Sequence, residues 1–314
     1  MKKFFLLLIV MMLVIPVKSQ LVKWSPEDVK LLTKHWEGER TPDGRPKVSD
    51  AHLERLKKLG FEEIWEFLRA RGYQNQFENF SSVSGNGWII LHPEQAMTGR
   101  VLTAQFMPMR FDFDDYLQEV GSKQDIRRVN NSLPVGLLTE GDIYVADAYE
   151  KIIDGTLMGG SVAATVYRNS KRGVILNGSV RDLEEVSAID GFNGWIRGHD
   201  PSAISGMVCA SVNAPIRIGR VTVLPGDVVL AKPGGVLFIP SHLAVESIVY
   251  AEIVALRDSY NTQLREGRID RSVEFRDWLN RQTNLPMTKA ELDAYFTQQA
   301  NQQANQQPAR SQRQ

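Results

Sequence analysis

Short apolar and β-branched runs, separated by turn signals, fill the chain from about residue 87 to 240, and this alternation limits the possible folds most strongly. The expected strands are Trp88–Leu91, Val101–Phe106, Ile143–Ala146, Val174–Leu176, Ile216–Val223, Val228–Leu230 and Val236–Ile239. Helical stretches are expected between them, near residues 112–119, 159–169 and 183–190. Strands that alternate with short helices predict an α/β domain.

A helical pattern precedes this domain. Phe61, Ile64, Trp65 and Leu68 recur at the spacing of one helical face, so residues 20–86 are expected to form a helical N-terminal extension. An apolar stripe of this kind must be covered, either by the main body of the chain or by another subunit.

A second helical pattern follows the domain. Residues 245–297 are expected to form C-terminal helices, and Thr288 with Glu291 has the capping-box spacing that opens the last of them. The tail 298–314 is rich in Gln and Asn and contains no apolar residue larger than alanine, so it is predicted to be disordered.

Residues 1–19 have the three-part layout of a secretory signal peptide. Two lysines precede the apolar run Phe4–Ile15, and small residues stand at Val17 and Ser19. Because the run is too short for an ordinary transmembrane helix, we expect cleavage near Ser19/Gln20 and an exported protein, periplasmic or secreted. No span is then expected in the mature chain. An uncleaved N-terminal anchor is the alternative.

The composition excludes several classes of function. The chain has 37 basic and 37 acidic residues, which argues against a nucleic-acid binder that neutralises phosphates. A single cysteine, Cys209, rules out an intrachain disulfide or a thiolate metal cluster, and we expect it to be a buried structural thiol. The five histidines form no HxxxH or HxH pair, and no nucleophile elbow or phosphate loop is present.

Two segments carry candidate chemistry. In the first, Gly159 and Gly160 enter a helical stretch of small residues, and the free N–H groups of such a helix start suit a carboxylate or phosphate. The alternative is that the two glycines only permit close packing between a strand and a helix.

The second segment is a buried strand that ends in a glycine-containing turn and presents Arg181 and Asp182. Arginine can clamp a carboxylate with two hydrogen bonds, and aspartate can hold a hard divalent cation directly or through water. The alternative is structural: Asp182 and Glu185 have the spacing of a capping box for a helix that runs through Ile189, with Arg181 on the surface.

Together the two segments resemble the RraA-like family, which includes class II 4-hydroxy-4-methyl-2-oxoglutarate/4-carboxy-4-hydroxy-2-oxoadipate aldolases and regulators of RNase E activity. The resemblance rests on Gly159-Gly160-Ser161-Val162, nineteen residues from Val162 to Arg181, and then Asp182. Gly99–Ala104, Pro225–Ala231 and Gly235–Pro240 are similar to other strands of that family. The similarity covers about residues 95–240.

The resemblance implies a fold and a set of site residues. The fold is a swivelling β/β/α-type domain over residues 87–244, with a β-barrel-like sheet, and the assembly is a homotrimer or a dimer of trimers. The substrate-binding residues implied are Gly159, Gly160, Ser161 and Val162, through their backbone amides, and Arg181, which is also the catalytic residue. Asp182 is implied to anchor Mg²⁺ or Mn²⁺, largely through waters.

The implied function is an exported, metal-dependent lyase that cleaves a small 2-oxo acid through a pyruvate enolate. Aldol cleavage of 4-hydroxy-4-methyl-2-oxoglutarate and decarboxylation of oxaloacetate share that enolate. Three departures from the aldolase pattern bear on the substrate: Gly160 replaces an acid, Asn177 replaces an Asp, and Lys232-Pro233-Gly234 replaces an acidic turn. A non-catalytic regulatory or small-acid-binding protein is the alternative. His199 lacks a phosphohistidine motif and is expected to be structural.

Overall fold

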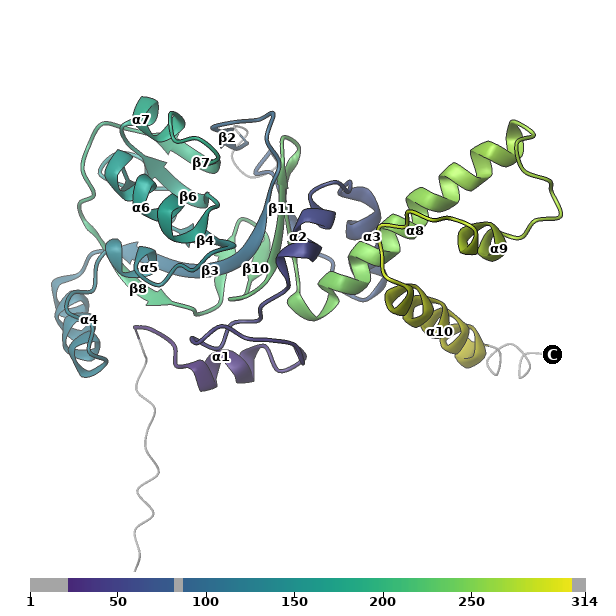
Figure 1. Cartoon of the computed structure of the whole chain (residues 1–314). Coiled ribbons are helices and arrows are strands. Elements are labelled where there is room, and N and C mark those ends of the chain that lie inside the picture. Colours follow the sequence, from purple (N-terminus) through teal and green to yellow (C-terminus); the bar gives the residue numbers. More distant parts are fainter. Residues whose placement is uncertain (1–21, 82–86, 307–314) are drawn as a thin grey trace, which may run out of the picture.

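The computed structural model describes residues 22–81 and 87–306, which form an α/β body with a helical arm (Figure 1). The helices are α1 (Pro26–Leu32), α2 (Asp50–Leu56), α3 (Glu62–Ala70), α4 (Phe111–Lys123), α5 (Ser132–Val135), α6 (Gly160–Ser170), α7 (Leu183–Ser187), α8 (Ser241–Arg265), α9 (Phe275–Asn280) and α10 (Lys289–Gln306). The predicted α/β class is confirmed, as are additional helices on both sides of the domain. The predicted signal peptide, residues 1–19, lies outside the described residues.

A ten-stranded mixed sheet forms the body, in the order β1-β12-β11-β3-β4-β6-β7-β2, with β5 paired to β6 and β8 paired to β3. The strands are β1 (Phe77–Glu78), β2 (Ile89–Ile90), β3 (Met97–Pro108), β4 (Asp142–Asp147), β5 (Thr156–Met158), β6 (Val174–Val180), β7 (Gly194–His199), β8 (Met207–Val212), β9 (Ile216–Ile218), β10 (Val221–Val223), β11 (Val228–Lys232) and β12 (Gly235–Ile239). The pairs β4–β6, β5–β6 and β6–β7 are parallel, so the carboxyl ends of these four strands meet at one edge of the sheet.

Both faces of the sheet are buried. Helices α5, α6 and α7 lie over one face (Figure 1), where Ala163 and Val166 of α6 join a core that also contains Leu176 of β6. On the other face, the separate β9–β10 hairpin packs against the sheet around Trp195, which is completely buried. The alternating apolar residues of the strands therefore fill two cores, as expected for a sheet covered on both sides.

The stripe predicted on the N-terminal extension is covered by the same chain. Ile64 and Leu68 of α3 are completely buried, and they pack with Leu230 of β11, Leu237 of β12 and Ile248 of α8. Because the main body covers this stripe, the stripe gives no support for contact with another subunit.

A buried ion pair fixes the N-terminal extension to the sheet. Arg45 is 1% exposed, and its Nη2 lies 2.9 Å from Oδ2 of Asp142, the first residue of β4. A buried ion pair of this kind is costly to break by removal of one partner. Earlier in the chain, Trp24 N–H donates to the carbonyl of Val212 at 3.1 Å and so extends the edge of β8. The extension is therefore an integral layer of the body.

Several element boundaries differ from the predictions. The run Ile216–Val223 is a hairpin, because Gly219 adopts a positive φ of 57° between β9 and β10. Strands β1, β5, β7 and β8 were not predicted, and they are short or contain Gly, Ser and Cys rather than β-branched runs. Among residues 22–81 and 87–306, no helix combines the length and hydropathy that crossing a bilayer requires.

The C-terminal boundaries also need correction. Helix α8 begins at Ser241, so the predicted division at residues 244 and 245 falls inside a helix. Helix α10 extends to Gln306 and contradicts the prediction of disorder for residues 298–306; Gln and Ala are good helix formers even without an apolar anchor. The rest of the predicted tail, 307–314, lies outside the described residues.

Candidate functional site

The two segments singled out in the sequence meet at the carboxyl edge of the parallel strands. Met158 at the end of β5 is the register partner of Val180 at the end of β6, and Arg181 N–H donates to the Met158 carbonyl at 3.0 Å. Gly159 follows the first strand and Arg181 the second, so they lie side by side. Ligands of α/β proteins bind outside the carboxyl ends of strands, which makes this edge the candidate site.

Helix α6 starts at this edge, as the paired glycines predicted. Gly159 is the N-cap with extended φ and ψ angles of −122° and −168°, and Gly160 is the first helical residue. The N–H groups of Ser161 and Val162 follow in the first turn, where an α-helix supplies no carbonyl acceptor. These N–H groups and the helix dipole form a place for an anion.

The Asp182 carboxylate is directed toward the start of α6. Its Oδ2 accepts from Gly160 N–H at 3.3 Å and lies 3.6 Å from Arg181 Nε. The structural alternative, a capping box, is wrong: Asp182 adopts left-handed angles, φ 53° and ψ 46°, and its side chain makes no capping bond to α7. That helix ends at Ser187, short of Ile189. The left-handed turn carries the carboxylate away from its own helix.

Both glycines lie in close contact with side chains of this turn and of α7. A Cβ atom at Gly159 would stand less than 3.0 Å from Asp182 Oδ2, a separation that real Cβ atoms do not show. A Cβ atom at Gly160 would stand equally close to Oε2 of Glu185. Close packing is therefore present at both glycines, but the partners are polar side chains of the turn and of α7 rather than residues of a strand. Such packing is compatible with an anion site at the same helix start.

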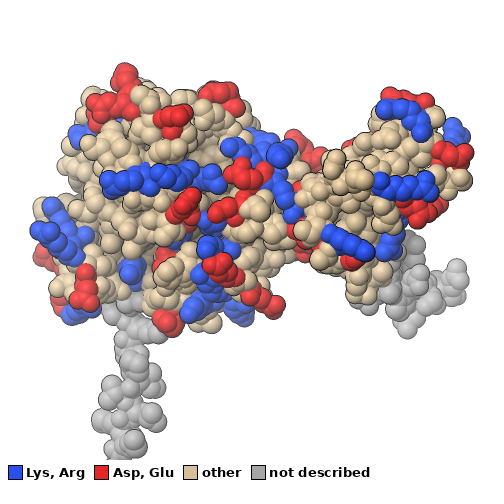
Figure 2. Space-filling model, in the orientation of Figure 1, with Lys and Arg blue, Asp and Glu red and all other residues tan. Residues whose placement is uncertain are grey.

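The electrostatic character of this edge is mixed. The Arg181 and Asp182 side chains are 45% and 42% exposed, and α7 has Glu184 and Glu185 in its first turn. Figure 2 shows acidic side chains at the end of the body that carries α7. A dianionic ligand would be repelled by these carboxylates and attracted by Arg181 and the α6 N-terminus. A cation bound beside these carboxylates would offset their repulsion, so this edge favours an anion that binds together with a cation.

The donor set at this edge suits a hydrated divalent cation. The described part of the chain has no group of three or more His, Cys, Asp or Glu side chains that could enclose a metal ion. Mg²⁺ keeps several waters and is commonly held by one or two carboxylates. The half-exposed Asp182 carboxylate could supply one ligand, with Glu185 close enough to act on the water shell.

The other departures lie at different ends of the strands, Asn177 opposite Asp147 at the carboxyl end of β4 and Lys232 at the amino end. Asn177 is buried within β6 and donates to Asp147 Oδ1 at 2.8 Å, while its own Oδ1 has no partner in the described structure. Lys232 ends β11 and donates to the carbonyl of Leu59 in the N-terminal extension. Since Ala231 is paired with Met97, where β3 begins, Lys232 lies at the amino end of the parallel strands.

The structure places two other reactive residue types. Cys209 is buried, and burial raises the pKa of its thiol to about 12, which confirms the expectation of an inert structural cysteine. His199 is exposed at the end of β7, where its register partner is Val180. Strand order alone brings it to the candidate edge, since no motif in the sequence around it indicates such a position.

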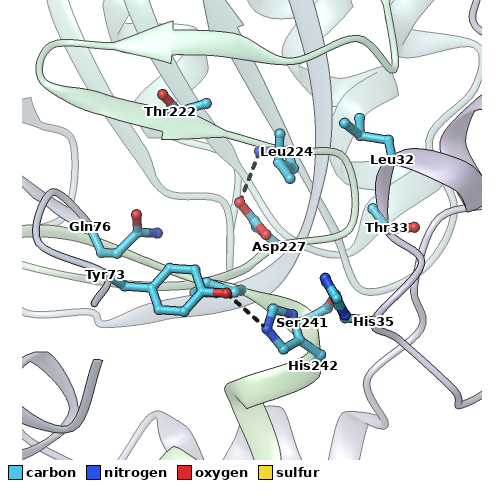
Figure 3. Close-up of a pocket in the computed structure, with 11 residues that line it drawn as sticks. Leu32, Thr33, His35, Tyr73, Gln76, Thr222, Leu224, Asp227, Ser241 and His242 are labelled. Atoms are coloured by element: carbon cyan, nitrogen blue, oxygen red, sulfur yellow. Dashed lines mark hydrogen bonds between the residues drawn. The ribbon is translucent and has the colours of Figure 1, made fainter. Parts of the chain in front are cut away.

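A cavity of about 240 Å³ lies elsewhere, between the N-terminal extension and the start of α8 (Figure 3). Two of its polar side chains are paired with neighbours: Tyr73 Oη lies 3.1 Å from His242 Nε2, and Asp227 Oδ2 accepts from Leu224 N–H at 2.9 Å. Burial raises the pKa of Asp227 to about 7. The cavity is lined by none of the residues predicted for the site.

Comparisons with known proteins bear on the family and the fold. A family model described as RraA-like, Aldolase/RraA, matches residues 46–238. The chain is 33% identical over 85 residues to a 4-hydroxy-4-methyl-2-oxoglutarate aldolase of Thermus thermophilus, which is 27% of this chain and 51% of that protein. It is 31% identical over 106 residues to Protein DlpA of Legionella pneumophila, 33% of this chain and 17% of that protein.

These curated relatives are matched over about half of their length or less. Among solved structures, the chain resembles Streptomyces coelicolor RraAS2, described as an unusual member of the RNase ES inhibitor RraA protein family. That match has a TM-score of 0.55 at 22% identity and covers 71% of this chain and all of that one. At this identity the likeness shows the fold alone.

Proposed function

Since the chain belongs to the RraA-like family, whose model covers more than half of it, we propose that it is a divalent-metal-dependent lyase acting on a small 2-oxo acid. The reactions proposed are aldol cleavage of the 4-hydroxy-4-methyl-2-oxoglutarate type and decarboxylation of oxaloacetate. One observation carries the proposal: the N-terminus of α6, Arg181 and Asp182 meet at the same sheet edge.

The N-terminus of α6 would bind the substrate carboxylate next to the 2-oxo group. The N–H groups of Ser161 and Val162 supply neutral donors, and the absence of a side chain at Gly159 and Gly160 leaves room for the Asp182 and Glu185 carboxylates beside the helix start. This arrangement recognises the part of the substrate that becomes pyruvate. The rest of the substrate would extend into solvent, which is compatible with more than one 2-oxo acid.

Arg181 would hold the substrate oxygens in place. Its only ion-pair partner in the described structure is Asp182 at 3.6 Å, so most of its donors are available to a ligand. A planar guanidinium can bind two oxygens at once and also favours the negative charge that develops on the 2-oxo oxygen.

Asp182 would anchor Mg²⁺ or Mn²⁺. Such an ion, when bound, polarises the 2-oxo group and favours the enolate that both reactions require. Asp182 itself keeps a fixed direction because Gly160 N–H and Arg181 hold its Oδ2. The carboxylate therefore faces the atoms that the α6 N-terminus would bind.

The test is a pyruvate-release assay over a panel of 2-oxo acids, with Mg²⁺ and with chelator. Turnover that requires the metal supports a lyase. Tight binding of the same acids without turnover would instead support the alternative, a non-catalytic small-acid-binding protein that uses the same loop.

Export and assembly complete the proposal. The two lysines and the run Phe4–Ile15 support export, and N-terminal sequencing of the mature protein should find a start near Gln20.

Family resemblance supports a homotrimer or a dimer of trimers, and Phe111, 83% exposed at the start of α4, is an apolar side chain that an assembly could cover. Light scattering that found a stable monomer at micromolar concentration would refute the assembly.

A further inference from the structure

Aldol cleavage needs a proton acceptor that decarboxylation does not need. When the C3–C4 bond of a 4-hydroxy-2-oxo acid breaks, its electron pair enters the enolate and the 4-hydroxyl must lose its proton to become a carbonyl. Decarboxylation of oxaloacetate breaks the C3–C4 bond of an ionised carboxylate, and CO₂ leaves without proton removal. The proposed function therefore requires one group for the first reaction that the second can do without.

The groups already assigned do not meet this need. Arg181 is a permanent cation with no acceptor atom. Asp182 Oδ2 already accepts from Gly160 N–H and faces Arg181, and in the proposed function this carboxylate anchors the cation. His199 lies across β6 from α6, because β5 and β7 pair with opposite edges of β6.

Glu185 has the required position. Its Oε2 occupies the space directly over Gly160, where a Cβ atom would be less than 3.0 Å away. Combined with the 3.3 Å contact from Gly160 N–H to Asp182, this places the two carboxylates within about 9 Å of each other. Both carboxylates are therefore within reach of one small substrate bound at the start of α6.

Glu185 is also free to react. Its side chain is exposed, and within the described structure its carboxylate has no hydrogen-bond or ion-pair partner. The left-handed turn at Asp182 starts α7 at the angle that carries Glu185 over α6. This carboxylate stands at the proposed site and has no structural bond to lose.

Resting on the proposed function, we propose that Glu185 accepts the 4-hydroxyl proton during aldol cleavage, directly or through one water. The O–H bond breaks, its electron pair forms the new C4 carbonyl, and the C3–C4 pair becomes the pyruvate enolate. The proton on Glu185 then returns to C3 of that enolate and gives pyruvate. No oxidant or further reactant is needed.

The test compares both reactions in Glu185→Gln, which keeps the shape of the side chain but cannot accept the proton. Pyruvate release from 4-hydroxy-4-methyl-2-oxoglutarate should fall by about 10²–10⁴-fold, the usual contribution of a positioned base. Oxaloacetate decarboxylation should fall far less, so the ratio of the two rates is the readout. Glu184→Gln, the neighbouring exposed glutamate, is the matched control and should leave the ratio unchanged.

Glu185→Asp separates proton transfer from packing, because it restores a carboxylate at a shorter reach and should recover part of the aldol activity. Circular dichroism and the Tm establish that each variant is folded. An unchanged ratio in Glu185→Gln would overturn the proton role, whether both reactions are lost equally or neither is lost. A wild-type protein that decarboxylates oxaloacetate but cleaves no aldol substrate overturns this inference alone. Absence of both reactions refutes the proposed function.

Discussion

Replacing each of the two glycines at the start of α6 by alanine tests whether the polar turn opposite them is held in place by close packing. In Gly159→Ala, the new methyl group would stand less than 3.0 Å from Asp182 Oδ2, whereas ordinary contact begins near 3.4 Å. The carboxylate must move by on the order of 1 Å, and misplacement of that size commonly costs about 100-fold in rate.

The expected stability effects have opposite signs. Gly159→Ala loses the Gly160 N–H bond to Asp182, about 1 kcal/mol, and puts a poorer residue at an N-cap, so the free energy of unfolding should fall by roughly 1–2 kcal/mol. In Gly160→Ala the shortest contact is with the exposed carboxylate end of Glu185, which can move, while the Glu185 Cβ stands 3.0 Å away; alanine is the better helix former by up to about 1 kcal/mol. Its stability should equal or exceed that of the wild type.

Thermal unfolding followed by circular dichroism measures the difference, and oxaloacetate decarboxylation with Mg²⁺ measures the effect of Gly159→Ala on the site. A Gly159→Ala protein as stable and as active as the wild type would refute the view that Gly159 is fixed by Asp182. Equal destabilisation by both substitutions would refute the distinction between them.

Three further predictions concern single residues. Arg181→Lys keeps the charge but loses the two-pronged geometry, so KM for 2-oxo acids should rise about 10–100-fold in steady-state kinetics, and an unchanged KM would exclude a clamp. Because burial raises the pKa of Asp227 to about 7, far above the unfolded value, its contribution to stability is complete below about pH 4 and is lost as pH rises through 7. Asp227→Asn should abolish that fall of about 2–4 kcal/mol in urea unfolding curves, and equal pH profiles for both proteins would contradict it. Asp182→Asn should leave the Tm nearly unchanged, since Asp182 makes no capping bond to α7, the Asn oxygen can still accept from Gly160 N–H, and Asn tolerates left-handed angles; a marked drop in Tm would restore the capping role.

Much of the body could be predicted because its strands are apolar runs bounded by turns. Val174–Leu176 and Val236–Ile239 fall inside observed strands for this reason. Strands such as β5 and β8 could not be predicted, because Thr156 and Cys209 belong to strands only through pairing with residues far along the chain. Residues 298–306 were assigned to a tail because their helix lacks an apolar face.

The candidate site was predictable up to the level of segments. Spacing and resemblance identified Gly159 and Asp182, and strand register then brought them together. The direction of the Asp182 side chain could not be predicted, since the capping-box spacing is present but the left-handed backbone defeats it. Glu185 carried the same misleading spacing, and only the packing of α7 against α6 shows that its carboxylate stands over Gly160.

The central claim is that Asp182 anchors the cation of a metal-dependent lyase, and pyruvate release by the wild type and Asp182→Asn tests it most directly. Asparagine retains the shape and backbone tolerance of aspartate but is a poorer ligand for a hard cation. We expect wild-type release from oxaloacetate or 4-hydroxy-4-methyl-2-oxoglutarate that requires Mg²⁺ or Mn²⁺ and stops with chelator, and a loss of at least ~100-fold in Asp182→Asn. Undiminished Mg²⁺-dependent release by Asp182→Asn would contradict the claim.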